Sequence, residues 1–135
     1  MQTNTYLTFN GNCKEAFEFY AKCLNGKIEA MMPHSGTPAE HHVPAEWRDK
    51  IVHARMSIGN EILMASDSPP DQYDRPQGFS VNLNLKDETE AKRIYDELSA
   101  NGKVTMPLAP TFWAKQFAMF VDRFGVPWMI NCGDN

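Results

Sequence analysis

The sequence lacks any apolar run near the roughly 20 residues that a membrane-spanning helix needs, and it has no cluster of Lys or Arg. Its 13 basic and 17 acidic residues give a formal net charge of −4. A chain without a basic patch is a poor candidate for binding nucleic acid or an anionic membrane. The segment Met1–Thr5 has neither the basic region nor the apolar core of an export signal, so we expect a cytoplasmic protein.

Cysteine is also scarce, with three in 135 residues and no CxxC spacing of the kind used for zinc or redox chemistry. Cys13 and Cys23 fall on one predicted helix. Their Cα atoms are then roughly 15 Å apart, too far for a disulfide. A reactive thiol is one interpretation, but small buried hydrophobic side chains are the favoured one.

An internal repeat organises the chain. The tripeptide Asn-Gly-Lys occupies positions 25–27 and returns 76 residues later at 101–103, each time after an amphipathic helical pattern. Repetition at this spacing in a short chain predicts one structural unit written twice. We expect Gly26 and Gly102 to supply the left-handed residue that ends each helix.

Each copy contains one predicted helix, from Cys13 to about Leu24 and from about Glu88 to Ala100. Asn12 and Asp87 are expected to cap the two helices through their side chains. A glutamate three residues later would complete a capping box in each case. Apolar residues at helical spacing give each helix one buried face. These residues are Cys13, Ala16, Phe17 and Tyr20 in the first helix and Ala91, Ile94, Tyr95 and Leu98 in the second.

The remaining β-prone stretches complete a β-α-β-β-β pattern in each half. The strands are predicted over residues 5–9, 28–32, 51–58, 61–65, 79–85, 103–106, 116–121 and 126–131. A two-residue turn at Gly59-Asn60 joins the third and fourth as a type II′ hairpin. We expect an α+β fold: one domain, 1–135, of two βαβββ modules (1–65 and 79–135) joined by a linker at 66–78. A monomeric barrel of another kind is the alternative.

Alternation along the strands predicts what each face does. The apolar faces should pack on the two helices, while the polar faces look into a shared concavity or are simply solvated. Shifting the fifth strand by the repeat length places Asn82 on Tyr6 and Asn84 on Thr8. The apolar sets are Phe79, Val81, Leu83 and Leu85, and Val52, Ala54, Met56 and Ile58; the polar sets are Ser80, Asn82 and Asn84, and His53, Arg55 and Ser57.

The duplicated βαβββ pattern, with Asn12-Cys13-Lys14-Glu15-Ala16 leading to Phe19-Tyr20, resembles the vicinal oxygen chelate (glyoxalase/bleomycin resistance/extradiol dioxygenase) superfamily. The resemblance covers essentially the whole chain and implies paired modules, a cupped mixed sheet with the helices outside, and a homodimer. Three segments resemble its PhnB-like branch in particular. They are Ile51-Val52-His53-Ala54, Thr111-Phe112-Trp113-Ala114 and Asp122-Arg123-Phe124-Gly125-Val126-Pro127-Trp128-Met129-Ile130-Asn131.

Members of this branch have often carried the label of a demethylubiquinone methyltransferase. That activity implies a nucleotide-type cofactor, which favours a Gly-rich turn between a strand and a helix. The chain has no such turn, so we expect no cofactor.

The superfamily's enzymes hold a divalent metal through His, Gln or Glu on the first and last strands of each module. Here no His or Glu occurs from Met1 to Phe9, and the other positions align with Ser80, Met129 and a residue near Met64. A thioether prefers soft metals and a hydroxyl is a weak neutral ligand. The resemblance therefore implies that the usual metal site is absent.

The expected function is binding of an unknown small molecule without a metal. Such sites are mainly apolar with a few placed polar groups, and Arg55 suggests a ligand with a carboxylate, phosphate or phosphonate-like group. Trp113 is expected either to cover the pocket or to fill a dimer interface, whereas Trp128 is expected in the core. The candidate ligand-binding residues are Tyr6, Thr8, His53, Arg55, Met64, Asn82, Asn84, Trp113 and Met129.

The alternative is a metal-dependent lyase, isomerase or dioxygenase with an unusual site around His53. It needs two more ligands, which the loop histidines His34, His41 and His42 would supply by folding over the sheet. As solvated loop residues these three would have no such role. His53 itself fits a hydrogen-bonding or general-base group, or a structural histidine bonded to the backbone.

Overall fold

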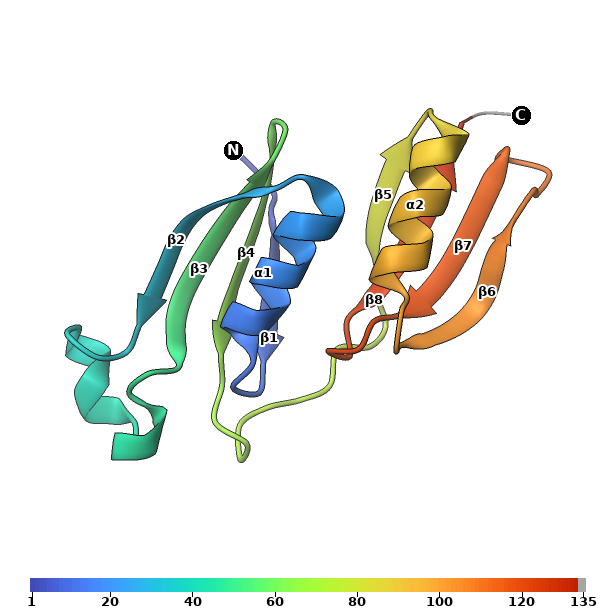
Figure 1. Ribbon diagram of the computed structural model, residues 1–135. Helices are drawn as coiled ribbons and strands as arrows, with labels where there is room; N and C mark the ends of the chain where they lie inside the picture. The colour runs from blue at the N-terminus through green and yellow to red at the C-terminus, as the bar shows by residue number, and fades with distance from the viewer. Residues whose placement is uncertain (134–135) are drawn as a thin grey trace. The chain divides into compact units, whose positions relative to one another are not determined.

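The computed structural model describes residues 1–133, which form two compact units, Met1–Asp74 and a second that begins at Arg75. Each unit contains one α-helix on a four-stranded mixed sheet, giving the α+β class that the sequence predicts (Figure 1). No helix among these residues is long and apolar enough to cross a membrane. The first unit comprises β1 (Thr5–Phe9), α1 (Cys13–Leu24), β2 (Lys27–Pro33), the 3-10 helices η1 (Pro38–His42) and η2 (Ala45–Trp47), β3 (Ile51–Ile58) and β4 (Glu61–Asp67); the second comprises β5 (Val81–Leu85), α2 (Glu88–Leu98), β6 (Lys103–Ala109), β7 (Gln116–Val121) and β8 (Pro127–Cys132).

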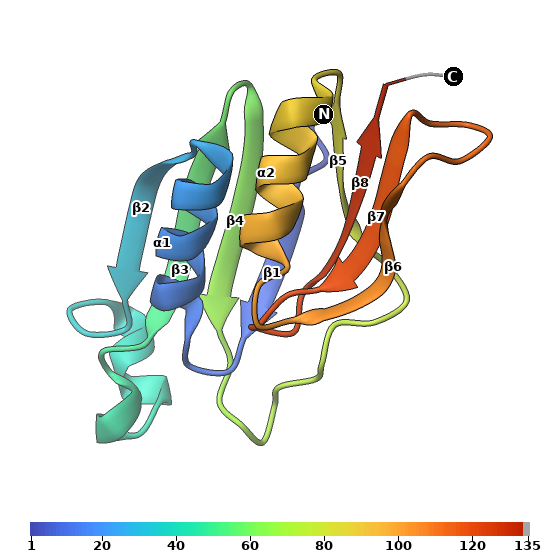
Figure 2. The same ribbon diagram turned by 45° about the vertical axis from the view of Figure 1, so that its right-hand side comes forward.

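The two sheets have the same topology. Their strand orders are β1-β4-β3-β2 and β5-β8-β7-β6, with the first strand of each unit parallel to the last and the other pairs antiparallel. In each unit the helix lies along one face of its own sheet, which both views show (Figure 2). The strands hydrogen-bond as two separate sheets, so the alternative of a single closed barrel is wrong.

Strand register confirms the repeat residue by residue. Tyr6 pairs with Met64 in the first unit, and Asn82 pairs with Met129 in the second. Within β5 the predicted alternation is confirmed: Leu83 pairs with Ile130, which is fully buried, whereas Asn82 and Asn84 are exposed. The hairpin at Gly59 has the expected positive φ of 58° at its first position.

The helix ends correct one prediction. The left-handed residues are Asn25 (φ 53°) and Asn101 (φ 63°), not the glycines that follow them. Asn tolerates this conformation better than other side chains. The glycines are needed for space instead: a Cβ on Gly26 would lie 2.7 Å from the Met56 sulfur, and one on Gly102 would overlap the Val121 carbonyl oxygen.

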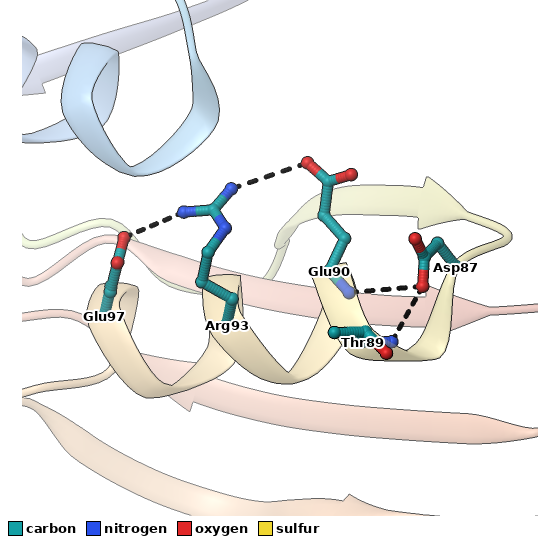
Figure 3. A network of polar contacts seen from close by, with 5 residues as sticks. All are labelled: Asp87, Thr89, Glu90, Arg93 and Glu97. Atoms are coloured by element: carbon teal, nitrogen blue, oxygen red, sulfur yellow. Dashed lines mark hydrogen bonds and ion pairs between the residues drawn. The ribbon is translucent and has the colours of Figure 1, made fainter.

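The helix starts differ between the copies. Asp87 caps α2 as predicted, its carboxylate accepting from the N–H groups of Thr89 (2.9 Å) and Glu90 (3.4 Å) (Figure 3). The Glu90 side chain instead forms an ion pair with Arg93, which also pairs with Glu97 on the helix surface. The prediction for Asn12 is wrong, because its side chain makes no capping bond.

Asp67 takes over the role predicted for Asn12. It is 6% exposed, and its carboxylate accepts from the N–H groups of Gly11 (2.9 Å), Cys13 (3.0 Å) and Ile51 (2.8 Å). One side chain from the end of β4 thus fixes the start of α1 and the start of β3. The prediction that residues 66–67 belong to a linker is therefore wrong, since β4 continues through them.

The cores lie between each helix and its sheet. All four residues predicted for the α1 face are buried, as are Ala91, Ile94 and Leu98 of α2. Trp128 is 1% exposed, as expected of a core residue, and its Nε1–H donates to Asp122 at 2.8 Å. The three cysteines are buried, and none of them forms a disulfide within residues 1–133.

Two sequence expectations fail at the ends of strands. Phe79 lies before β5 and is 49% exposed, rather than on its apolar face. At the start of β3, Ile51 is buried and Val52 is only half-buried. The reason is that the pairing with β2 slips by one residue between Met32 and Pro33. That slip changes which face the first residues of β3 present.

Candidate functional site

The first candidate group lies on the strand face of the first unit that alternates away from the core. Tyr6 is 46% exposed while its neighbour Leu7 is buried. The Tyr6 hydroxyl lies 3.2 Å from His53 Nδ1, the donor being set by the imidazole tautomer, and the two rings stack with centroids 5.9 Å apart. The structure therefore brings these two predicted residues into direct contact.

Arg55 and Met64 extend this group across the sheet. Met64 pairs with Tyr6 on one side and with Arg55 on the other, so its thioether lies between them. The Arg55 guanidinium is already near a carboxylate, with Nε 3.7 Å from Glu29 Oε1, and both side chains are about two-fifths exposed. This long, solvent-screened pair leaves most of the guanidinium's donors available.

Thr8 lies two residues along β1 from Tyr6, on the same face. It is half-buried and pairs with Ser66. It adds a hydroxyl beyond Tyr6. The first unit thus holds five of the nine predicted residues in one strip of sheet.

The second unit contains a continuous chain of hydrogen bonds. Trp113 Nε1–H donates to Asn131 Oδ1 (3.2 Å), Asn131 Nδ2 donates to Asn82 Oδ1 (2.6 Å), and Asn82 Nδ2 donates to Asn84 Oδ1 (3.0 Å). Three predicted residues are thereby connected through one residue that the sequence reasoning missed. Met129 is half-buried beside Asn82, with which it pairs.

The donor-to-acceptor direction of this row of hydrogen bonds is fixed by Trp113, its first residue. An indole N–H can only donate, so Asn131 must present its oxygen to Trp113 and its amino group to Asn82. The same constraint passes along to Asn84, which accepts from Asn82. The Asn84 amino group is therefore the donor end of the chain, directed away from it.

Asn131 was detectable from the sequence, since it alternates with Met129 on the strand face already selected. It was overlooked because attention fell on the positions aligned with metal ligands. No comparable periodic signal marks Lys86 and Lys115, which follow or precede strands and lie close to this chain in space.

The residues at the superfamily's usual metal positions do not suit a hard divalent ion. Met64 and Met129 offer thioethers, and Ser80 lies just outside β5 with a neutral hydroxyl. Among residues 1–133, no three His, Cys, Asp or Glu side chains gather closely enough to hold a metal.

The loop histidines behave in two ways. His41 and His42 are exposed in η1, as expected of solvated residues. His34 is not solvated: it is 6% exposed, with Nδ1 2.7 Å from the Lys50 carbonyl oxygen. The backbone N–H of His34 also donates to that oxygen at 2.9 Å, so this imidazole closes the base of the loop.

Comparison with known proteins now decides the family. Residues 3–130 match the profile of the Glyoxalase/Bleomycin resistance protein/Dioxygenase superfamily. The chain belongs to this superfamily. A relative of this glyoxalase-superfamily protein, Protein YjdN of Escherichia coli (strain K12), is 35% identical over 139 residues, which cover 97% of this chain and 95% of the relative.

Solved structures support the same placement. Protein PA1353 from Pseudomonas aeruginosa is 48% identical, with a TM-score of 0.90 over 100% of this chain and 99% of that one. The PhnB protein from Bacillus cereus shares the fold at 21% identity, with a TM-score of 0.83 over 98% of this chain and 100% of that one. The protein is thus a member of the glyoxalase superfamily, with the fold of the PhnB protein.

Proposed function

We propose that this protein binds a small organic molecule without using a metal ion. The observation that carries the proposal is the one-directional chain from Trp113 to Asn84. A row of amides held in one orientation is preorganised, and preorganised donors bind a ligand without the cost of ordering themselves.

The first unit supports the same function. Tyr6 and His53 are already in contact, and Arg55 keeps donors free beside the Met64 thioether. Two or three placed polar groups beside apolar surface are typical of a site for an organic ligand. The guanidinium favours a ligand that carries a carboxylate, phosphate or phosphonate group.

A thermal-shift screen of metabolites tests this function. A compound present at 100 times its Kd adds about 2.7 kcal/mol to the free energy of unfolding, which is a clear rise in melting temperature. The affinity of any hit should then be measured in Arg55→Ala and His53→Ala. Arg48→Ala, an exposed arginine between η2 and β3, is the matched control.

We expect one or both site variants to weaken binding and the control to leave it unchanged. If the affinity of a confirmed ligand is the same in both site variants, the assignment of this group to the ligand site is wrong.

Elemental analysis of protein purified without an affinity tag tests metal independence. We expect less than about a tenth of an equivalent of Zn, Mn, Ni or Fe, because one imidazole near a guanidinium holds a divalent ion poorly. A stoichiometric metal that is lost in His53→Ala would overturn the proposal and favour a metal-dependent enzyme.

A further inference from the structure

A pocket of about 550 Å³ opens at the donor end of the amide chain, and its described lining lies entirely in the second unit. Its lining includes Asn84, Lys86, Trp113, Lys115, Asn131 and Gly133. No Asp or Glu is among the described residues of the lining. In a protein of net charge −4, a pocket lined by two lysines and no carboxylate is an electropositive exception.

Within residues 1–133, the two acidic side chains that follow Lys86 in the sequence are occupied elsewhere. Asp87 accepts from the first turn of α2, and Glu88 accepts from Gln116 Nε2 at 3.4 Å. Neither lines the pocket. The two ammonium groups are therefore not neutralised from within the lining.

Lys115 is held in place by its alkyl chain. A Cβ placed on Gly133 would lie 3.0 Å from Lys115 Cδ and 3.4 Å from Cγ, so the side chain runs over bare backbone. Gly133 is itself fixed, with φ of 65° and its N–H donating to the Leu85 carbonyl at 2.8 Å. Packing of the stem leaves the charged end to reach outward.

Trp113 provides an ordered aromatic wall. Thr111 Oγ1 accepts from the N–H groups of Trp113 (3.3 Å) and Ala114 (3.1 Å), which stiffens the loop before β7. The indole also meets the buried Phe117 edge to face, with centroids 5.1 Å apart. It remains 44% exposed, so part of its surface is available to a ligand.

We propose that this pocket is an oxyanion subsite, which binds the carboxylate, phosphonate or phosphate group of an organic ligand whose planar part stacks on Trp113. The Asn84 amino group donates to the oxyanion while Lys86 and Lys115 balance its charge. This inference rests on the proposed small-molecule function and adds a second position for an oxyanion, in the unit that does not contain Arg55.

Phenylphosphonate is the probe, because it combines one ring with one oxyanion. Its binding is followed by amide NMR through the Trp113 indole N–H and the Asn84 side-chain amide. Inorganic phosphate and benzyl alcohol are the two partial probes. We expect saturable shifts of both signals with phenylphosphonate, and weaker binding of the probes that lack either the ring or the charge.

The variants remove charge while keeping shape. Lys86→Met with Lys115→Met keeps the alkyl stems, and we expect it to weaken phenylphosphonate binding at least about tenfold, equivalent to about 1.4 kcal/mol. Asn84→Asp still accepts from Asn82 but loses the donor and adds a negative charge, so it should weaken binding at least as much. Lys103→Met, on an exposed residue of β6, should bind like the wild type.

Absence of saturable shifts at Trp113 and Asn84, or unchanged affinity in the double lysine variant, would overturn the subsite. The proposed function fails separately. If a hit from the metabolite screen binds the wild type and the double lysine variant equally well, the protein is still a small-molecule binder and only the subsite is wrong.

Discussion

At the scale of single residues, two buried carboxylates organise the molecule, one in each unit. Asp67 accepts three backbone N–H bonds, and Asp122 accepts from the N–H groups of Phe124 and Val126 and from the Trp128 indole. Buried carboxylates are stable only when hydrogen-bonded in this way. Neither residue contacts a candidate ligand group through these bonds, so their role is to hold strands and turns in place.

Replacement of Asp67 by alanine should therefore be severely destabilising. It leaves the N–H groups of Gly11, Cys13 and Ile51 without their acceptor, so we expect a loss of about 3 kcal/mol in the free energy of unfolding. Urea denaturation measures it. Asp74→Ala, on an exposed carboxylate, should change stability by less than about 0.5 kcal/mol. Similar losses in the two variants would contradict the proposed role of Asp67.

Cys13 should lower the free energy of unfolding as the pH becomes alkaline. Burial raises the pKa of its thiol far above the ordinary value of 9.0, and the nearby Asp67 carboxylate raises it further. Because the folded pKa is the higher one, this stabilisation is complete below about pH 9 and is lost as the unfolded chain ionises above it.

Between about pH 8 and pH 10 the wild type should lose about 1 kcal/mol more stability than Cys13→Ala. Urea denaturation at several pH values checks this difference. Parallel pH profiles for the two proteins would show that the Cys13 thiol is not protected from ionisation.

At the scale of elements, the repeated Asn-Gly-Lys tripeptide shows how two adjacent residues divide one task. Asn25 takes the left-handed conformation that ends α1, whereas Asn101 takes it in the turn after α2, whose C-cap is Ser99. In both units the glycine that follows leaves room for a neighbouring strand. The close neighbour is the Met56 side chain in the first unit and the Val121 backbone in the second. A methionine side chain can move aside, whereas a backbone carbonyl in a sheet cannot.

The two glycines should thus differ in their response to one added methyl group. Gly102→Ala forces β6 away from β7 and should cost about 3 kcal/mol, whereas Gly26→Ala should cost about 1 kcal/mol as Met56 adjusts. Urea denaturation of the matched pair measures both. Equal losses, or a larger loss at Gly26, would show that the contacts do not control these positions.

These elements also show what the sequence can and cannot predict. Strand and helix locations follow from apolar periodicity, which is why α1 and β1 have their predicted bounds. The Asp67 network escaped prediction because it joins residues more than fifty positions apart. The faces of Asn82 and Asn84 were predictable because they follow from alternation along one strand. Their link through Asn131 to Trp113 and their proximity to Lys115 were not, because these contacts join separate parts of the chain.

At the scale of the whole molecule, five of the eight large exposed apolar side chains of residues 1–133 lie in the second unit. Val104 and Met106 on β6 are 38% and 43% exposed, and Phe112, just before β7, is 90% exposed. Large exposed apolar groups that lie near one another are typical of an interaction surface. Phe112 packs edge to face against its neighbour Trp113, with ring centroids 4.8 Å apart.

We expect the chain to form a homodimer in which this surface is covered. Light scattering coupled to size exclusion at micromolar concentration should give about twice the chain mass of 15.3 kDa. Phe112→Asp combined with Met106→Asp should shift the mass towards the monomer, because burying either carboxylate at an interface is unfavourable. Phe79→Asp, on an aromatic residue 49% exposed before β5, is the control and should remain dimeric. A wild-type mass of one chain would show that the protein is a monomer. A dimer that survives the double substitution but is lost in Phe79→Asp would show that the interface lies at Phe79 instead.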